Sequence, residues 1–264
     1  MQISMKKIVN YLALMVVLTT LLGTAGCENS VTGSGEIATW DMDYSDFNKL
    51  EIDSTFNVEI NRADSYLVRL TIDKKLYEYL KIDQRGDTLR IGLKPNYAYI
   101  DTKQQAIINL PDLHRLKLSD ASIAFVSGFS VSHSLDFELS DASRLELGHT
   151  LAGNSSFLLS NASKVTGSIE MDDGNFRLND SSSLELEGSA DDIKIDAAAS
   201  SVVTLPDFTV VTADVELSAS SSAVINVSSR MDINLSSSSE LEYIGSPKLG
   251  KLEMSGDSTL NQKQ

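Results

Sequence analysis

The sequence predicts an all-β protein that folds as a parallel β-helix with rungs of about 19 residues, after an N-terminal β-rich portion that contains one short helix. Three observations support this prediction. The pentapeptide Leu-Ser-Asp-Ala-Ser begins at Leu118 and again at Leu139, 21 residues later. Apolar residues recur at a similar interval through the second half of the chain. Between them, segments such as 184–196 alternate apolar and polar residues, which is typical of strands.

Residues 1–26 are predicted to be a lipoprotein signal peptide. Lys6 and Lys7 form a basic start, and the apolar run that follows is too short for an ordinary membrane span. The segment Thr-Ala-Gly-Cys that ends at Cys27 is similar to the lipobox of bacterial lipoproteins. We therefore expect Cys27 to be acylated and to anchor the protein to outer-membrane lipid. An ordinary signal peptide followed by a coincidental cysteine is the alternative.

Residues 27–46 begin with a stretch rich in Ser, Gly and Thr and are predicted to be a lipid-anchored tether. Residues 47–110 contain several short strand-like runs and one stretch, 74–80, in which the apolar residues have helical spacing. We expect this part to form a β-rich cap of the solenoid, because an open strand edge invites aggregation. The boundary is placed near Leu110, where aromatic residues become rare.

Residues 111–264 are predicted to form the rungs. The reference position of each rung is the Leu of Leu-Ser-Asp, and another apolar residue stands two positions before it. The predicted reference residues, at intervals of 17 to 22 residues, are Leu118, Leu139, Leu159, Leu178, Ile195, Leu217, Leu235 and Met254. Residues two apart on a strand share a face, so each apolar pair is expected to point into a common core.

The Ser-Asp-Ala-Ser segment is predicted to be a corner between two strands, because Asp, Asn and Ser hydrogen-bond their own backbone and tolerate tight turns. A unit of strand, corner, strand and return loop is too short to bury its own apolar face. Successive units must therefore stack, with parallel strands about 4.8 Å apart. Antiparallel sandwiches require no such register, and propeller blades are about 40 residues or longer.

The charge of the chain excludes one class of partner. The formal net charge is -15, and removal of Lys6 and Lys7 with the signal peptide makes it -17. Such an acidic protein repels nucleic acid, so no nucleic-acid partner is expected.

Catalytic motifs are also missing from the sequence. The three histidines, His114, His133 and His149, fall in different units and at different phases of the repeat. No catalytic triad order, metal-ligand spacing or phosphate loop is present. The sequence therefore predicts a protein that is not an enzyme and has no catalytic residues, no cofactor and no metal site.

Two groups of residues are candidate binding sites. Stacking of the corners aligns Asp120, Asp141, Asn161 and Asp180 into a column, which is either a shallow cation or glycan site or a row of solvent-exposed turns. Four tyrosines, Tyr77, Tyr79, Tyr97 and Tyr99, lie close together in the N-terminal part. They are expected either to bind sugar rings as an aromatic patch or to pack against the first rungs and cap the solenoid.

Four segments carry a resemblance to a known family. They are Gly-Ser-Gly-Glu-Ile at 33–37, the strand-like segment 47–60, Asp-Thr-Leu-Arg-Ile-Gly-Leu at 87–93, and the Leu-Pro-Asp-Leu turn at 110–113 that leads into the first corner. In this order they resemble the head GIN domain family of auto-transporter adhesins, over roughly residues 47–243. The resemblance implies a right-handed parallel β-helix in a secreted or lipid-anchored protein of Bacteroidetes-like bacteria. It brings no catalytic residues.

The leading functional prediction is a non-enzymatic, exported lipoprotein of the outer membrane, an adhesin whose β-helix presents a surface to an extracellular glycan or protein. The first alternative is a periplasm-facing envelope scaffold or stress-related protein. An enzyme that acts on polysaccharide is the third possibility. The sequence leaves open whether the protein faces the cell surface or the periplasm.

Overall fold

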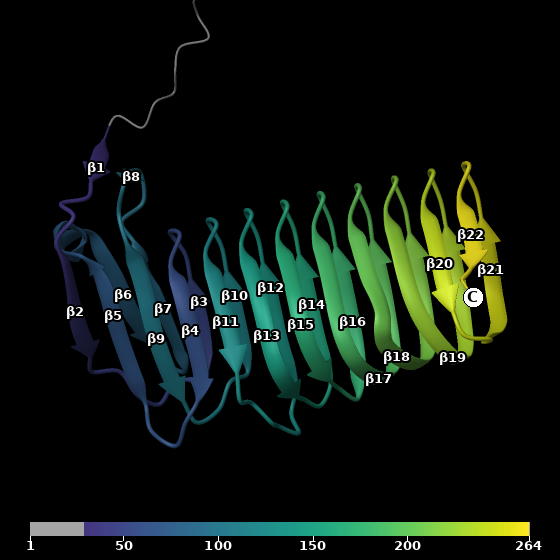
Figure 1. Ribbon diagram of the computed structural model, residues 1–264, viewed down its shortest axis with the longest axis horizontal. Helices are drawn as coiled ribbons and strands as arrows, with labels where there is room; N and C mark the ends of the chain where they lie inside the picture. Colours follow the sequence, from purple (N-terminus) through teal and green to yellow (C-terminus); the bar gives the residue numbers. More distant parts are fainter. Residues whose placement is uncertain (1–28, 264) are drawn as a thin grey trace, which may run out of the picture.

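The computed structural model describes residues 29–263 as an elongated solenoid of stacked β-strands (Figure 1). In this part of the chain the single helix is the short 3-10 helix η1 (Lys74–Tyr79). The predicted all-β parallel β-helix with one short helix near residues 74–80 is therefore confirmed. The predicted signal peptide and Cys27 lie outside the described residues. Within residues 29–263, no helix is long and apolar enough to cross a membrane.

The strands form two walls, which we call A and B, joined by a corner in each rung. In spatial order the A strands are β6 (Leu80–Arg85), β7 (Thr88–Leu93), β3 (Lys49–Ile52), β10 (Arg115–Leu118), β12 (Leu135–Leu139), β14 (Ser155–Leu159), β16 (Asp173–Leu178), the second halves of β17 (Ser183–Ala197), β18 (Val202–Leu217) and β19 (Ser222–Leu235), and β21 (Lys248–Met254).

The B strands follow the corners. In the same direction they are β2 (Ile37–Met42), β5 (Leu67–Asp73), β9 (Gln104–Leu110), β4 (Asn57–Arg62), β11 (Ile123–Ser127), β13 (Arg144–Leu151), β15 (Lys164–Glu170), the first halves of β17, β18 and β19, β20 (Glu240–Ile244) and β22 (Thr259–Gln262). A separate parallel pair, β1 (Ser30–Thr32) and β8 (Ala98–Ile100), lies beside the N-terminal end (Figure 1).

The rungs stack in the predicted register with one exception. Leu118 lies opposite Leu139, and Leu139 lies opposite Leu159. In the fifth rung the predicted reference residue, Ile195, is wrong: it pairs with Phe176, and the true reference residue is Ala197, opposite Leu178. A shift of two residues keeps every side chain on the same face, so the alternating pattern of this segment did not distinguish the two registers.

The corrected register completes a column of serines, each four residues after its reference position. The column consists of Ser122, Ser143, Ser163, Ser182, Ser201, Ser221, Ser239 and Ser258. Most of these serines are buried, and several hydroxyls bond to the rung before. The Ser143 Oγ donates to the carbonyl oxygen of Leu118 at 3.2 Å, and the Ser221 Oγ donates to that of Ala197 at 2.8 Å. These carbonyl oxygens also accept from the backbone N–H groups of Ser140 and Ser218, so the second bond gives the buried serine hydroxyl a partner.

Each corner is a tight turn with two consecutive residues at positive φ. In the rung of β10 and β11 these residues are Asp120 and Ala121, with φ of 52° and 57°. Two-residue turns of this kind favour Asn, Asp and Gly, which adopt the left-handed conformation most easily. The backbone N–H of Ala121 donates to the carbonyl oxygen of Asp141 in the next rung at 2.8 Å, and equivalent bonds recur along the column. The corners therefore form a continuous row along one edge (Figure 1).

The two ends of the solenoid differ. Although β3 and β4 precede residue 110, they stack as a full rung, between β10 and β7 on wall A and between β11 and β9 on wall B. Beyond this rung, β5 and β2 add to β9 in antiparallel fashion, and β6 adds to β7 in the same way. At the other end, every residue of β21 is exposed. The regular rungs are thus covered at one end by antiparallel strands, and the edge at the other end is exposed.

Candidate binding face

The outer surface of wall A carries a series of charge pairs, with Leu158 as an exposed apolar side chain among them. The Arg90 guanidinium lies 2.8 Å from the Glu51 carboxylate, Arg115 lies 3.5 Å from Asp136, and Lys117 bonds to Glu138. Such pairs continue toward the C-terminal end. Exposed ion pairs of this kind contribute at most about 1 kcal/mol each and keep a surface solvated. Wall A therefore has the character of an ordinary hydrated surface.

The outer surface of wall B has a different composition near the N-terminal end. On β9 and β11, three large apolar side chains point outward: Ile107, Ile123 and Phe125 are 37%, 42% and 38% exposed. β4 lies between these two strands, so Glu59 is paired with Ile107 on one side and with Phe125 on the other. Clustered apolar side chains on an exposed sheet commonly mark an interaction surface. We call the outer surface of β9, β4 and β11 the B face.

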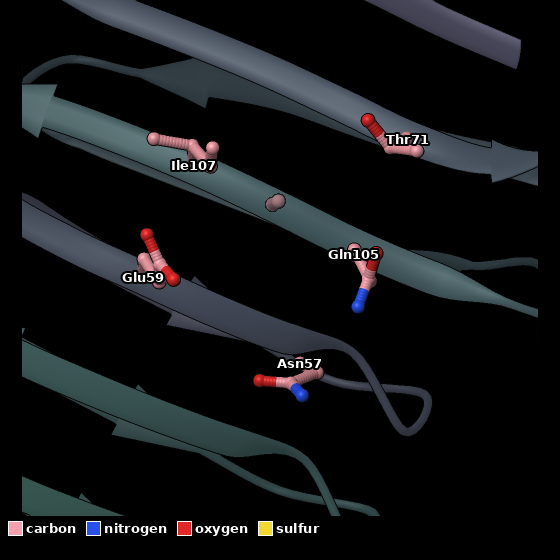
Figure 2. Close-up of a pocket in the computed structure, with 6 residues that line it drawn as sticks. Asn57, Glu59, Thr71, Gln105 and Ile107 are labelled. Carbon is pink, nitrogen blue, oxygen red and sulfur yellow. The ribbon is translucent and has the colours of Figure 1, made fainter.

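Polar side chains accompany the apolar ones on the B face. A shallow depression of about 150 Å³ is lined by Asn57, Glu59, Thr71, Gln105, Ala106 and Ile107 (Figure 2). In Figure 2 the Gln105 side chain extends from β9 toward β4, and Glu59 projects from β4 beside Ile107. The depression thus combines amide, hydroxyl and carboxylate groups with one apolar wall. Such a mixture can hydrogen-bond to a polar ligand and also contact its apolar parts.

The polar part of the B face extends onto the next row of side chains. The Ser127 Oγ donates to the Asn61 side-chain oxygen at 3.0 Å, and the Asn61 amide reaches the Asn109 side-chain oxygen at 3.5 Å. A second, larger depression of about 570 Å³ follows on β11, β13 and β15; among its lining residues are Ile123, Arg144 and Lys164. The B face therefore continues as a polar and partly apolar strip across several rungs.

The predicted column of Asp120, Asp141, Asn161 and Asp180 occupies the first left-handed position of four successive corners. The Asn161 amide donates to the Asp141 carboxylate at 2.9 Å, and this bond, with one from Ser140, lowers the pKa of Asp141. Burial, with the nearby charges of Asp53 and Asp141, raises the pKa of Asp120. The left-handed backbone accounts for Asp and Asn at these positions without a ligand, and a cation or glycan site here remains a prediction.

The four predicted tyrosines separate into two groups. Tyr79, Tyr97 and Tyr99 lie together, with ring centroids 5.0 to 6.2 Å apart, and they pack partly buried against the core. Tyr77 is 52% exposed and contacts Trp40 instead, at 4.9 Å between ring centroids. The first group thus packs against the core. Capping of the solenoid by these tyrosines and sugar binding both remain predictions.

The structure also brings together three residues that sequence spacing did not connect. Asp112 and His114 lie on the loop between β9 and β10, and His133 lies on the loop that precedes β12. The two imidazole rings are stacked, 3.9 Å apart and within 5° of parallel. The Asp112 carboxylate reaches both rings, 3.0 Å from the Nε2 of His114 and 2.8 Å from the Nε2 of His133.

The surroundings of this group affect two pKa values. Burial lowers the pKa of His133, but its hydrogen bonds to the Ser134 carbonyl and to Asp112 outweigh burial, so its pKa lies above the usual value. Burial raises the pKa of Asp112, and bonds to the two histidines outweigh it and lower that pKa. Relative to its strand, His133 stands two positions earlier than His114. Because of this offset, an alignment of the strands does not place the two histidines together. An alignment of the loops that precede β10 and β12 would have identified the group.

Comparison with known proteins identifies the same fold in several bacteria. A protein of Parabacteroides merdae, described as a "putative adhesin", is 18% identical with a TM-score of 0.82, and the match covers 89% of this chain and 100% of that one. A protein of Parabacteroides distasonis, described as a "putative lipid binding protein", is 19% identical with a TM-score of 0.81 and the same coverage. A Bacteroides fragilis "putative adhesin" is 14% identical with a TM-score of 0.64, and the match covers 88% and 100% of the two chains.

At these identities the likeness concerns the fold alone. No curated protein matches the chain. The sequence itself provides the assignment, because one family model matches residues 46–247. The chain belongs to the family described as "Putative auto-transporter adhesin, head GIN domain".

Proposed function

We propose that this protein is an exported, lipid-anchored adhesin that binds an extracellular glycan or protein with its B face. The observation that carries the proposal is the exposure of Ile107, Ile123 and Phe125 on the neighbouring strands β9 and β11. Their hydration is unfavourable, and a ligand that covers them removes apolar area from water. Hydrogen bonds can orient that ligand, because the amides of Asn57 and Gln105 and the carboxylate of Glu59 line the adjacent depression.

The rigidity of the B face supports the same function. Each of its strands is hydrogen-bonded on both sides, since β4 lies between β9 and β11 and β11 lies between β4 and β13. A surface that is ordered before binding loses little conformational entropy when the ligand arrives. Membership of an adhesin family and the predicted acylation of Cys27 agree with a role at the cell envelope. The envelope scaffold and the polysaccharide-acting enzyme are the alternatives.

The first experiment locates the protein. Intact cells of the native host are treated with protease, alongside permeabilised cells and cells that carry the unanchored variant Cys27→Ala. Cleavage on intact cells is the expected result, with loss of the cell-bound protein in the variant. Protection on intact cells and cleavage only after permeabilisation would contradict the adhesin and favour the periplasm-facing scaffold.

The second experiment tests whether the B face binds the ligand. The chain is applied to arrays of glycans and of host extracellular proteins, and the variants Phe125→Ser and Ile107→Ser are compared with Leu158→Ser. Leu158 is 48% exposed and belongs to wall A, so it is a matched control. We expect the B-face variants to reduce retention at least tenfold and Leu158→Ser to leave it unchanged. An equal loss of retention in Phe125→Ser, Ile107→Ser and Leu158→Ser would refute binding by the B face. A loss of retention in the further variant Tyr77→Ser alone would place the site at the aromatic patch instead. Turnover of an arrayed polysaccharide would support the enzyme instead.

A further inference from the structure

We propose that Asp112, His114 and His133 form a binding site for a divalent transition-metal ion of the Zn²⁺ class. Each of the three residues offers one ligand atom, and these atoms lie within 4.8 Å of one another. In residues 29–263 they are the one group of His, Cys, Asp and Glu side chains with this proximity. Two imidazoles and a carboxylate form a donor set that suits Zn²⁺, Ni²⁺ and Cu²⁺ better than Ca²⁺ or Mg²⁺.

The distances between donor atoms suit a small ion. Metal–ligand bonds of about 2.0–2.2 Å place the ligand atoms of a tetrahedral site roughly 3.4 Å apart. The Asp112 oxygens already lie 2.8 Å and 3.0 Å from the two Nε2 atoms. A bound ion replaces the protons that these atoms now share. The donor atoms then separate by about half an ångström, and the two imidazoles, which are parallel within 5°, rotate so that their Nε2 lone pairs converge on the ion.

A second contact prepares His133 for this role. Its Nδ1 lies 3.0 Å from the carbonyl oxygen of Ser134, an acceptor, so the ring proton of the neutral imidazole is held at Nδ1. When an ion displaces the proton that Nε2 shares with Asp112, the remaining ring proton stays at Nδ1 and the Nε2 lone pair can bind the ion. Histidine ligands of metals typically donate their other ring N–H to a carbonyl or carboxylate in this manner, which fixes the tautomer and the ring orientation.

The backbone holds both loops in place. The N–H of His114 donates to the carbonyl oxygen of Asn48 at 2.7 Å, and the carbonyl oxygen of His114 accepts from Asp136 at 2.9 Å. The carbonyl oxygen of His133 accepts from the N–H of Gly153 at 3.0 Å. The three side chains are each about one-third to two-fifths exposed, so the ion can enter from solvent and complete its coordination with water. The ion would join the loops of two successive rungs.

The test uses the chain with Cys27→Ala, so that the thiol cannot bind metal, and titrates Zn²⁺ by calorimetry. We expect one ion per chain, a higher melting temperature with Zn²⁺, and at least tenfold weaker binding in His133→Ala and in Asp112→Asn. His149→Ala is the matched control, because His149 is exposed on another rung. It should bind as the parent does. Circular dichroism establishes that each variant is folded.

Substitution by Co²⁺ provides a readout that depends on the ligands themselves. The visible absorption of Co²⁺ bound through imidazole nitrogen should appear in the parent and be lost in His133→Ala. Two results would overturn the proposal: equal Zn²⁺ affinity in the parent and His133→Ala, or an equal loss in His149→Ala. Several weak ions per chain without a change in melting temperature would instead show diffuse binding to surface carboxylates, and this too would refute the site.

Discussion

The phenyl rings of Phe137 and Phe157 stack in successive rungs, 4.9 Å apart with an interplanar angle of 26°. Phe157 also meets the ring of Phe176 at 5.4 Å, and Phe208 continues the row at 6.4 Å from Phe176. All four side chains are buried. This row of rings fills the centre of the solenoid and links the stability of each rung to that of its neighbours.

Replacement of Phe157 by alanine should lower the free energy of unfolding by about 3–5 kcal/mol, because it leaves a cavity between two rings. Phe157→Asp should be still more destabilising, since it buries a charge in the core. Both are measured by thermal and denaturant unfolding. Leu158→Ala serves as the control, since Leu158 points to solvent, and should change stability by about 0.5 kcal/mol or less. Wild-type stability in Phe157→Asp would contradict the register.

The corner at Ala199 should tolerate glycine better than alanine. Ala199 and Ser200 have φ of 52° and 62°, a conformation that strains residues with a Cβ atom. Ala199→Gly is expected to raise stability by about 0.5–1 kcal/mol, seen as a higher melting temperature. The adjacent variant Ala198→Gly, at a position without positive φ, should lower it. A lower melting temperature in Ala199→Gly would show that the corner is not strained.

Gly188 should not tolerate a side chain. Its φ is 130°, and an added Cβ would lie 2.0 Å from the carbonyl oxygen of Ile169 in the neighbouring rung. Gly188→Ala is therefore expected to destabilise the protein by at least about 2 kcal/mol. Gly86 is a suitable comparison, because its φ is also positive, at 60°, with nothing within 4 Å of the added atom. Gly86→Ala should cost only about 1 kcal/mol, and an equal loss in both variants would exclude the predicted clash.

Asp73 should make stability depend on pH. Its buried carboxylate accepts from the Ser34 hydroxyl and from the N–H groups of Gly35 and Lys75, at 2.8, 2.8 and 2.9 Å. Burial alone would raise the pKa of Asp73, but these hydrogen bonds outweigh it and hold the pKa below its usual value. The folded pKa is thus lower than the unfolded pKa of about 3.9. The resulting stabilisation is complete above that value and is lost as the pH falls through the folded pKa.

Asp73→Asn should therefore melt at a lower temperature than the parent at pH 7, and the difference should shrink as the pH falls below about 4. Melting curves between pH 7 and pH 3 provide the measurement. Asp43→Asn, which alters an exposed carboxylate in the same region, should give no comparable difference. A gap between Asp73→Asn and the parent that is constant over the whole range would rule out the carboxylate charge as its cause.

The stacked rungs could be predicted from the sequence because their pattern is local. Leu116 and Leu118 share a face of one strand, and the same pair of positions recurs in each unit, so parallel stacking follows from the alternation alone. The placement of Ala197 could not be predicted in this way. A shift of two residues leaves Ile193 and Ile195 on the inner face, and only the pairing of whole strands selects between the two registers.

The side chains that meet on the outer surface could not be predicted from the alternation of apolar and polar residues. The strand β4 enters between β9 and β11, so Glu59 stands between Ile107 and Phe125, from strands that are far apart in the chain. The Asp112 group arises in a similar way, because two loops of unequal length stack and bring His114 onto His133. Strand periodicity therefore determined the solenoid and its inner face. Strand order and loop length, which only the tertiary structure decides, determined what its outer face brings together.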